Sequence, residues 1–247
     1  MFQPHGSSPQ LHWTCQRLLA AGLPCQVPEE SPLWLPPDWE GYLAENCWLD
    51  LASDDSQALA VRSEHCRQHG KQLVEICASW QPQGEVLGFM LLCGSSASLS
   101  PAAVQWLDHC APLAGAWLHC GPCGSARYTH HVMQALQHAW QLAWQQCPPT
   151  ANPQLLDWEA LMQQQWQIAD KLLQLSQAYL RSHGIAPDTA DSASVRQRFA
   201  LPPASQTHFA ANLALLIVLA MQQRDTLHDI LQQVFAALQP KQPPKAD

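Results

Sequence analysis

The feature that most constrains the fold is a change in hydrophobic period near residue 124. Before it, short apolar segments with strand-like spacing alternate with short helical segments and turns. After it, apolar residues recur every three or four positions over long stretches. The chain has 247 residues, enough for two domains of ordinary size. We therefore expect an α+β domain over residues 1–123, an α-helical domain over 124–240 and a disordered polar tail over 241–247.

Two helix starts in the first domain have the same form. Ser8-Pro9 and Ser100-Pro101 each place a serine N-cap before a proline at the first helical position. Gly22 should end the first helix. The second helix carries apolar residues at helical spacing over 104–118, so we expect it to continue to about residue 118.

The middle of the first domain predicts strands. Residues 47–51 have period-2 character, and a helix is expected to follow, beginning at Ser53. Residues 72–80 and 85–93 are two apolar segments joined by Gln-Pro-Gln-Gly, which is turn chemistry. The pattern predicts a β-hairpin.

The order of hairpin, polar loop and helix resembles the C-terminal part of GAF domains. The residues that carry the resemblance are Gly84-Glu85-Val86-Leu87-Gly88 and Leu99-Ser100-Pro101. The similarity covers about residues 45–120 and implies a small antiparallel sheet with flanking helices. In this family such a domain either encloses a small ligand or serves in dimerisation and docking. The segment between residues 52 and 70 is short for a ligand pocket, which favours the contact role. The helical half resembles no family.

Long helices are expected in the second half. Periodic apolar residues predict helices over 128–146, 155–183 and 205–238. In the first of these, one stripe contains Val132, Leu136, Trp140 and Trp144; the second carries Trp158 and Trp166. Tryptophans at this spacing usually belong to a core, because buried aromatic side chains dominate packing. The alternative is a groove for a partner, since Trp is enriched at interface hot spots.

The charge balance argues against nucleic-acid binding. Charged residues make up 13% of the chain, the net charge is −8, and the 12 Lys and Arg residues do not cluster. A nucleic-acid interface normally needs a basic patch. The short basic piece at Arg196 and Arg198 is instead a candidate protein contact.

No targeting or membrane segment is expected. The N-terminus lacks a positive region followed by an apolar run, so it does not read as a secretory signal. The longest apolar run, residues 209–221, is shorter than the roughly 20 residues that span a bilayer. We therefore expect a cytoplasmic protein whose ten cysteines are reduced.

Cys120-Gly121-Pro122-Cys123 is the sharpest motif. Its letters match the CGPC of thioredoxin, and two thiols at a helix N-terminus suit redox chemistry because the helix dipole lowers a thiol pKa. However, His119 stands where thioredoxins have Trp, and a helix is expected to lead into the motif. A turn with incidental cysteines is the favoured interpretation. A redox pair and a metal site that also uses Cys110 or His119 are the alternatives.

No catalytic motif is present to name a reaction. The chain lacks a Gly-rich phosphate loop and a nucleophile elbow, and no cofactor or bound metal is expected. The favoured hypothesis is a non-enzymatic regulatory or scaffold protein that contacts a protein partner or a second copy as a homodimer. The alternatives are a thiol-redox or metal-binding protein and a small-molecule sensor with a GAF-type pocket.

Overall fold

The computed structural model describes residues 1–26, 32–52, 56–146, 157–186 and 191–223. They fall in two compact units. The first consists of Met1–His130 and Phe199–Ala211, and the second of His131–Arg198 and the residues from Asn212 onward. Among the described residues, none of the helices combines the length and the apolar character that crossing a bilayer requires.

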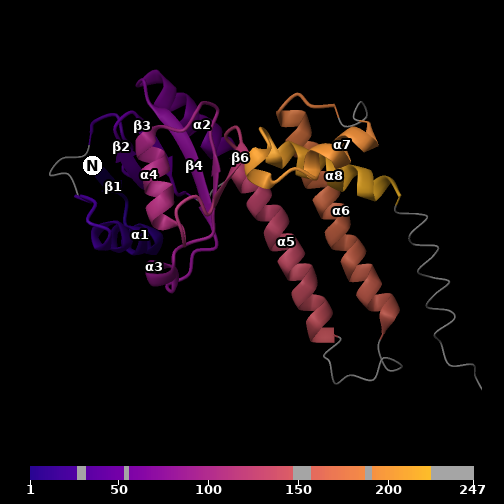
Figure 1. The fold of residues 1–247 in the computed structure, drawn as a ribbon. Coiled ribbons are helices and arrows are strands. Elements are labelled where there is room, and N and C mark those ends of the chain that lie inside the picture. The colour runs from indigo at the N-terminus through magenta and orange to yellow at the C-terminus, as the bar shows by residue number, and fades with distance from the viewer. Residues whose placement is uncertain (27–31, 53–55, 147–156, 187–190, 224–247) are drawn as a thin grey trace, which may run out of the picture. The chain divides into compact units, whose positions relative to one another are not determined.

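The first unit is built on a six-stranded sheet whose strands lie in their order along the chain (Figure 1). The strands are β1 (Phe2–His5), β2 (Gly41–Ala44), β3 (Cys47–Asp50), β4 (Gln72–Ala78), β5 (Leu91–Gly94) and β6 (Trp117–Gly121). The pairs β1–β2, β2–β3 and β4–β5 are antiparallel, whereas β3–β4 and β5–β6 are parallel.

The α+β class is confirmed, but the prediction of an antiparallel sheet is wrong for the two parallel pairs. Parallel neighbours need a connection that returns the chain to the same edge of the sheet, usually a helix. Here α2 (Ser56–Gln68) joins β3 to β4, and α4 (Pro101–Cys110) joins β5 to β6. The sheet is therefore mixed.

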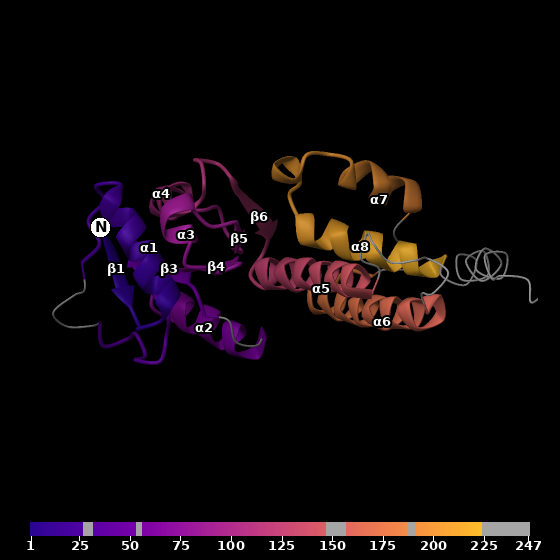
Figure 2. The ribbon, with the colours of Figure 1, turned by 90° about the horizontal axis from the view of Figure 1, so that it is seen from below.

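Helices cover both faces of the sheet. Cys47 and Leu49 of β3 pack in one core cluster with residues of α1 (Pro9–Ala20) and α4. Trp48, between them, packs in a second cluster with Leu59 and Cys66 of α2. Because successive side chains of a strand point to opposite faces, β3 is buried on both sides. Figure 2 shows α4 and α2 on opposite sides of β4.

The predicted second strand of the hairpin is only partly correct. Residues 84–87 form a short helix, α3 (Gly84–Leu87), and the strand begins at Leu91. A Cβ at Gly84 would collide with the Phe89 ring, and one at Gly88 would collide with the backbone of Ala111 and Pro112. Gly88 has φ of 88°, which glycine adopts readily. The chain therefore folds tightly back here before it becomes extended.

The helix that begins at Ser100 is shorter than predicted. Ser100 caps α4 as expected, since its Oγ accepts a hydrogen bond of 3.2 Å from the Ala103 amide. The helix ends at Cys110 because Pro112 disfavours helical geometry at Ala111, which is extended with ψ of 164°. Residues 117–121 then form β6 rather than continuing a helix.

The long helices predicted over 128–146 and 155–183 are present, whereas the last one begins at Phe209 and not at residue 205. They are α5 (Ser125–Gln146), whose first residues belong to the first unit, α6 (Trp158–Ser182), α7 (Ser192–Phe199) and α8 (Phe209–Gln222), with a 3-10 helix at Pro203–Ser205. Asp157 caps α6 by accepting a hydrogen bond of 2.9 Å from the Ala160 amide. Residues 224–238 of the predicted helix and the polar tail lie outside the described residues.

Candidate protein-interaction site

Four large apolar side chains of α5 lie in solvent. Their exposed fractions are 45% for Met133, 55% for Leu136, 67% for Trp140 and 54% for Trp144. We call these four residues the α5 stripe. Of the predicted buried stripe, only Val132 is buried. The expectation of a core position is therefore wrong for Trp140 and Trp144.

The helix geometry explains why this face is uncovered. Ala135, His138 and Leu142 line the side of α5 that faces α6, and the Ala139 carbonyl accepts a hydrogen bond of 3.1 Å from Gln165 of α6. At about 100° per residue, the α5 stripe lies roughly 150° around the helix axis from that side. Helix α5 thus has two apolar faces, and α6 covers only one of them.

The exposed tryptophans form a pair. Their ring centroids are 6.0 Å apart and the ring planes are inclined by 31°. Residues 128–146 contain no Asp, Glu, Lys or Arg, so the polar positions of this helix segment are Gln, His, Thr and Tyr. The surface around the tryptophans therefore carries little formal charge. Such a surface suits an apolar contact better than recognition of an ion.

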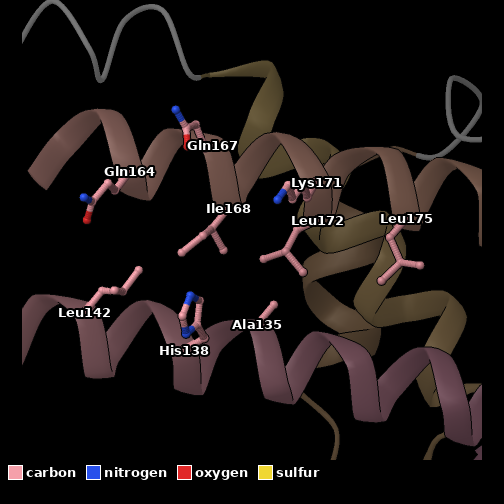
Figure 3. A pocket seen from close by; sticks show the side chains of 9 residues that line it. All are labelled: Ala135, His138, Leu142, Gln164, Gln167, Ile168, Lys171, Leu172 and Leu175. Atoms are coloured by element: carbon pink, nitrogen blue, oxygen red, sulfur yellow. The ribbon is translucent and has the colours of Figure 1, made fainter. Parts of the chain in front are cut away.

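The side of α5 that faces α6 is incompletely filled. A groove of about 270 Å³ lies between the two helices. In Figure 3, Leu142 of α5 and Ile168 and Leu172 of α6 point into this space, while Gln167 points away from it. Ala135 and Leu175 add apolar surface, and His138, Gln164 and Lys171 add polar groups. The groove is short and mainly apolar, which suits side chains of a protein more than a polar metabolite.

The first unit has an exposed apolar patch of its own. Its members Val86, Leu87, Met90 and Leu113 are 69–79% exposed. Arg17 of α1 donates hydrogen bonds to the carbonyls of Val86 (2.8 Å), His109 (2.7 Å) and Ala111 (2.7 Å). These bonds hold α3 and the end of α4 against α1. We call the four residues the α3 patch.

The cysteine motif follows a strand, which corrects the expected helix. Cys120 is buried near the end of β6, and its thiol donates to the Leu118 carbonyl at 3.7 Å. Cys123 lies in the following turn, and its thiol donates to the Leu73 carbonyl at 3.7 Å. Burial raises the pKa of Cys120 to about 12 and also raises the pKa of Cys123. A reactive thiolate needs the opposite shift.

The positive end of the α5 dipole, which would activate a thiol, is occupied by Glu75 of β4. Its carboxylate accepts hydrogen bonds from the amides of Gly124 (2.8 Å), Ala126 (3.2 Å) and Arg127 (3.1 Å). The Arg127 guanidinium lies 3.5 Å away, and both side chains are buried. Glu75 therefore caps α5 from within the sheet.

The sequence reasoning did not single out Glu75. The usable signal was a carboxylate inside the otherwise apolar strand sequence QLVEICA. A buried charge needs a partner, so this position could have indicated an ion pair, but not which residue would supply the cation.

The other residues singled out in the sequence belong to four different elements, α4, β6, α6 and α7. Cys110 is buried at the end of α4, where burial raises its pKa, and His119 is partly buried in β6. In the described part of the chain, no three His, Cys, Asp or Glu residues are grouped so as to hold a metal ion. Arg196 and Arg198 are exposed on α7, and Arg198 donates to the Ser194 carbonyl at 3.3 Å. Trp166 is partly buried in α6, and the side chain of Trp158 lies outside the described residues.

Comparison with known proteins adds no family. No family model matches the chain, and no curated protein is significantly similar to it.

Proposed function

We propose that this chain is a non-enzymatic regulatory or scaffold protein that acts through protein–protein contacts. The observation that carries the proposal is the exposure of Trp140 and Trp144 on a long, uncharged stretch of helix. Trp is among the residues most enriched at the energetic centres of interfaces. Contiguous apolar side chains at the surface of a folded unit are typical of an interaction site.

The energetic reason is the removal of apolar surface from water. Burial contributes about 25 cal/mol per Å² of apolar area, and each tryptophan offers a large, rigid surface. Met133 and Leu136 extend the same face toward the N-terminal end of α5, so the α5 stripe continues over about three helical turns. A partner helix laid along it would contact all four side chains.

We propose that the partner is a second copy of the chain. Two copies with a net charge of −8 each repel one another, so they associate most easily where neither carries charge. Residues 128–146 provide such a surface. A two-fold axis across α5 would bring the same stripe of both copies together, as closed homodimers require.

The first unit would contribute contacts through the α3 patch, in keeping with the docking role of a GAF-like domain. The layer between its sheet and α1 and α4 is filled by side chains. Tyr42, Trp106 and Leu18 are 0% exposed, and the Tyr42 hydroxyl donates to the Leu11 carbonyl at 2.9 Å. This packing favours contacts at the surface over a ligand held inside that layer.

Sedimentation of the full chain tests the proposal. We expect the wild-type protein to be a dimer at micromolar concentration, and the double variant Trp140→Ala/Trp144→Ala to be a folded monomer. The matched control is Gln137→Ala/Gln141→Ala, which changes exposed polar residues of the same helix and should remain dimeric. A monomeric wild-type protein, or a dimer that survives loss of both tryptophans, would overturn the proposed homodimer.

A further inference from the structure

Two cysteines of the first unit form a thiol pair. Cys15 lies in α1, and Cys25 lies in the segment that follows the helix. The Cys15 thiol donates a hydrogen bond to Cys25 Sγ, with 2.8 Å between the sulfur atoms. A disulfide bond is about 2.05 Å long, so bond formation requires only a small further approach. Both residues are free thiols in this structure.

The surroundings give the two thiols different roles. Cys15 is partly exposed and Cys25 is 8% exposed in the main core of the unit. An oxidant in solution therefore reaches Cys15 first. Burial and the hydrogen bond from Cys15 raise the pKa of Cys25, so Cys25 is protonated in the reduced pair. It must give up this proton as it attacks, and its 2.8 Å distance from Cys15 Sγ, not its acidity, makes it the resolving residue. This arrangement suits an attacked sulfur and a nearby resolving thiol.

The two cysteines of the CGPC motif make contacts of another kind. The thiols of Cys120 and Cys123 each donate to a backbone carbonyl, on Leu118 and Leu73. Cys47 likewise donates to the Ala44 carbonyl at 3.1 Å. The CGPC motif is the sharpest thiol motif of the sequence, but in the folded chain it is Cys15 and Cys25 whose sulfur atoms are in contact.

We propose that Cys15 and Cys25 form a reversible intramolecular disulfide, with a hydroperoxide as the oxidant. The Cys15 thiolate attacks the terminal peroxide oxygen, so that an S–O bond forms, the O–O bond breaks, and the leaving hydroxide or alkoxide takes up a proton to give water or an alcohol. Cys25 sulfur then attacks the sulfenic sulfur of Cys15. The S–S bond forms, the S–O bond breaks, and the hydroxyl group leaves with the Cys25 proton as water. The two thiols lose two electrons, and the peroxide gains them.

The bond would fasten the sheet edge to α1. The Phe2 amide donates to the Pro24 carbonyl at 3.1 Å, and the Gln26 amide donates to the Phe2 carbonyl at 3.2 Å. Cys25 thus lies in the backbone that pairs with the outer side of β1. A disulfide to α1 would join β1, its neighbouring segment and the helix covalently. Such a cross-link restricts the unfolded chain and raises the midpoint of thermal unfolding.

The test is performed on the full wild-type chain. The reduced protein is treated with a stoichiometric amount of hydrogen peroxide, denatured in the presence of an alkylating reagent, and digested for peptide mapping. We expect the free thiol count to fall from ten to eight, a cross-linked peptide containing Cys15 and Cys25, and a thermal midpoint higher by several degrees. Dithiothreitol should restore all thiols and the original midpoint.

Cys15→Ser should abolish the cross-linked peptide, whereas Cys123→Ser should leave it unchanged. The peptide map of the oxidised wild-type protein shows whether Cys15 and Cys25 are cross-linked even if a variant is unstable. The proposal is overturned if oxidation joins Cys120 to Cys123, links two chains, or converts Cys15 to a sulfinic or sulfonic acid while Cys25 stays free.

Discussion

Arg62 Nη2 lies 2.9 Å from Asp50 Oδ2, and both side chains are buried between α2 and the end of β3. Arg62 Nε also donates to the same oxygen at 3.2 Å. The ion pair therefore fixes α2 against the strand that precedes it. Its counterpart on the surface of α2 is the Arg67–Glu64 pair at 2.6 Å, with side chains 73% and 50% exposed.

The two pairs should differ sharply in their effect on stability. Arg62→Ala leaves the Asp50 carboxylate buried with less compensation, and we expect a loss of about 3–5 kcal/mol in the free energy of unfolding. Arg67→Ala should have little effect on the free energy of unfolding, because solvent screens an exposed pair. Urea denaturation measures both. Equal losses of stability in Arg62→Ala and Arg67→Ala would contradict the expectation that the buried pair matters more.

Replacing Glu75 should release the start of α5. Glu75→Ala removes the acceptor of three backbone amides and leaves Arg127 without this partner, so we expect a loss of about 3 kcal/mol or more. Glu75→Gln keeps one acceptor oxygen and should cost less. Hydrogen exchange at Gly124, Ala126 and Arg127 should accelerate in the order wild type, Gln, Ala.

The exposed cap of α6 provides the control for Glu75. Asp157→Ala removes a single capping bond, which is typically worth about 1 kcal/mol. If Glu75→Ala proves no more costly than Asp157→Ala, the buried carboxylate does not organise the helix start as inferred.

Alkaline pH should destabilise the first unit through Cys120. Burial raises the pKa of this thiol from its ordinary value of 9.0 to about 12 in the folded chain. Between these values the unfolded chain gives up the proton while the folded chain retains it. Stability therefore falls as pH rises from 9 toward 12, by up to about 1.4 kcal/mol per pH unit for one such group.

The measurement is urea denaturation of the wild type and Cys120→Ala at pH 7, 8 and 10. Between pH 7 and 8, the stability difference between the two proteins should be constant. At pH 10 the wild type should have lost more stability than the variant. An identical loss in both proteins would show that Cys120 does not titrate in this way.

Truncation of two helix tryptophans, Trp106 and Trp140, should change the free energy of unfolding by very different amounts. Trp106 of α4 is 0% exposed, so Trp106→Ala should cost about 3–5 kcal/mol of stability. Trp140→Ala removes an exposed side chain and should change the stability of the monomer by no more than about 0.5 kcal/mol. Dilute protein, below the concentration at which copies associate, is required for this comparison. A large loss for Trp140→Ala would mean that its ring packs within the chain.

Several structural features were predictable because their causes are local. The cap at Ser100, the long helices 125–146 and 158–182, and the α+β character of the first half follow from neighbouring residues. The end of α4 was also encoded locally, in Pro112, although the apolar spacing that continues to residue 118 concealed it. A proline outweighs periodicity because its ring restricts the residue before it.

The sequence by itself determined that helices begin at Pro9 and Pro101, that residues 47–50 and 72–78 are extended, and that residues 128–146 carry no charged side chain. Only the tertiary structure decided that β3 pairs with β4 in parallel, that Glu75 caps α5, that Cys15 meets Cys25, and that Trp140 faces solvent. The physical reason is range. Caps and periodicity depend on residues within about four positions of each other. Strand partners, ion pairs and the covering of one apolar face join residues far apart in the chain, and a single sequence does not state which of its apolar faces will find a neighbour.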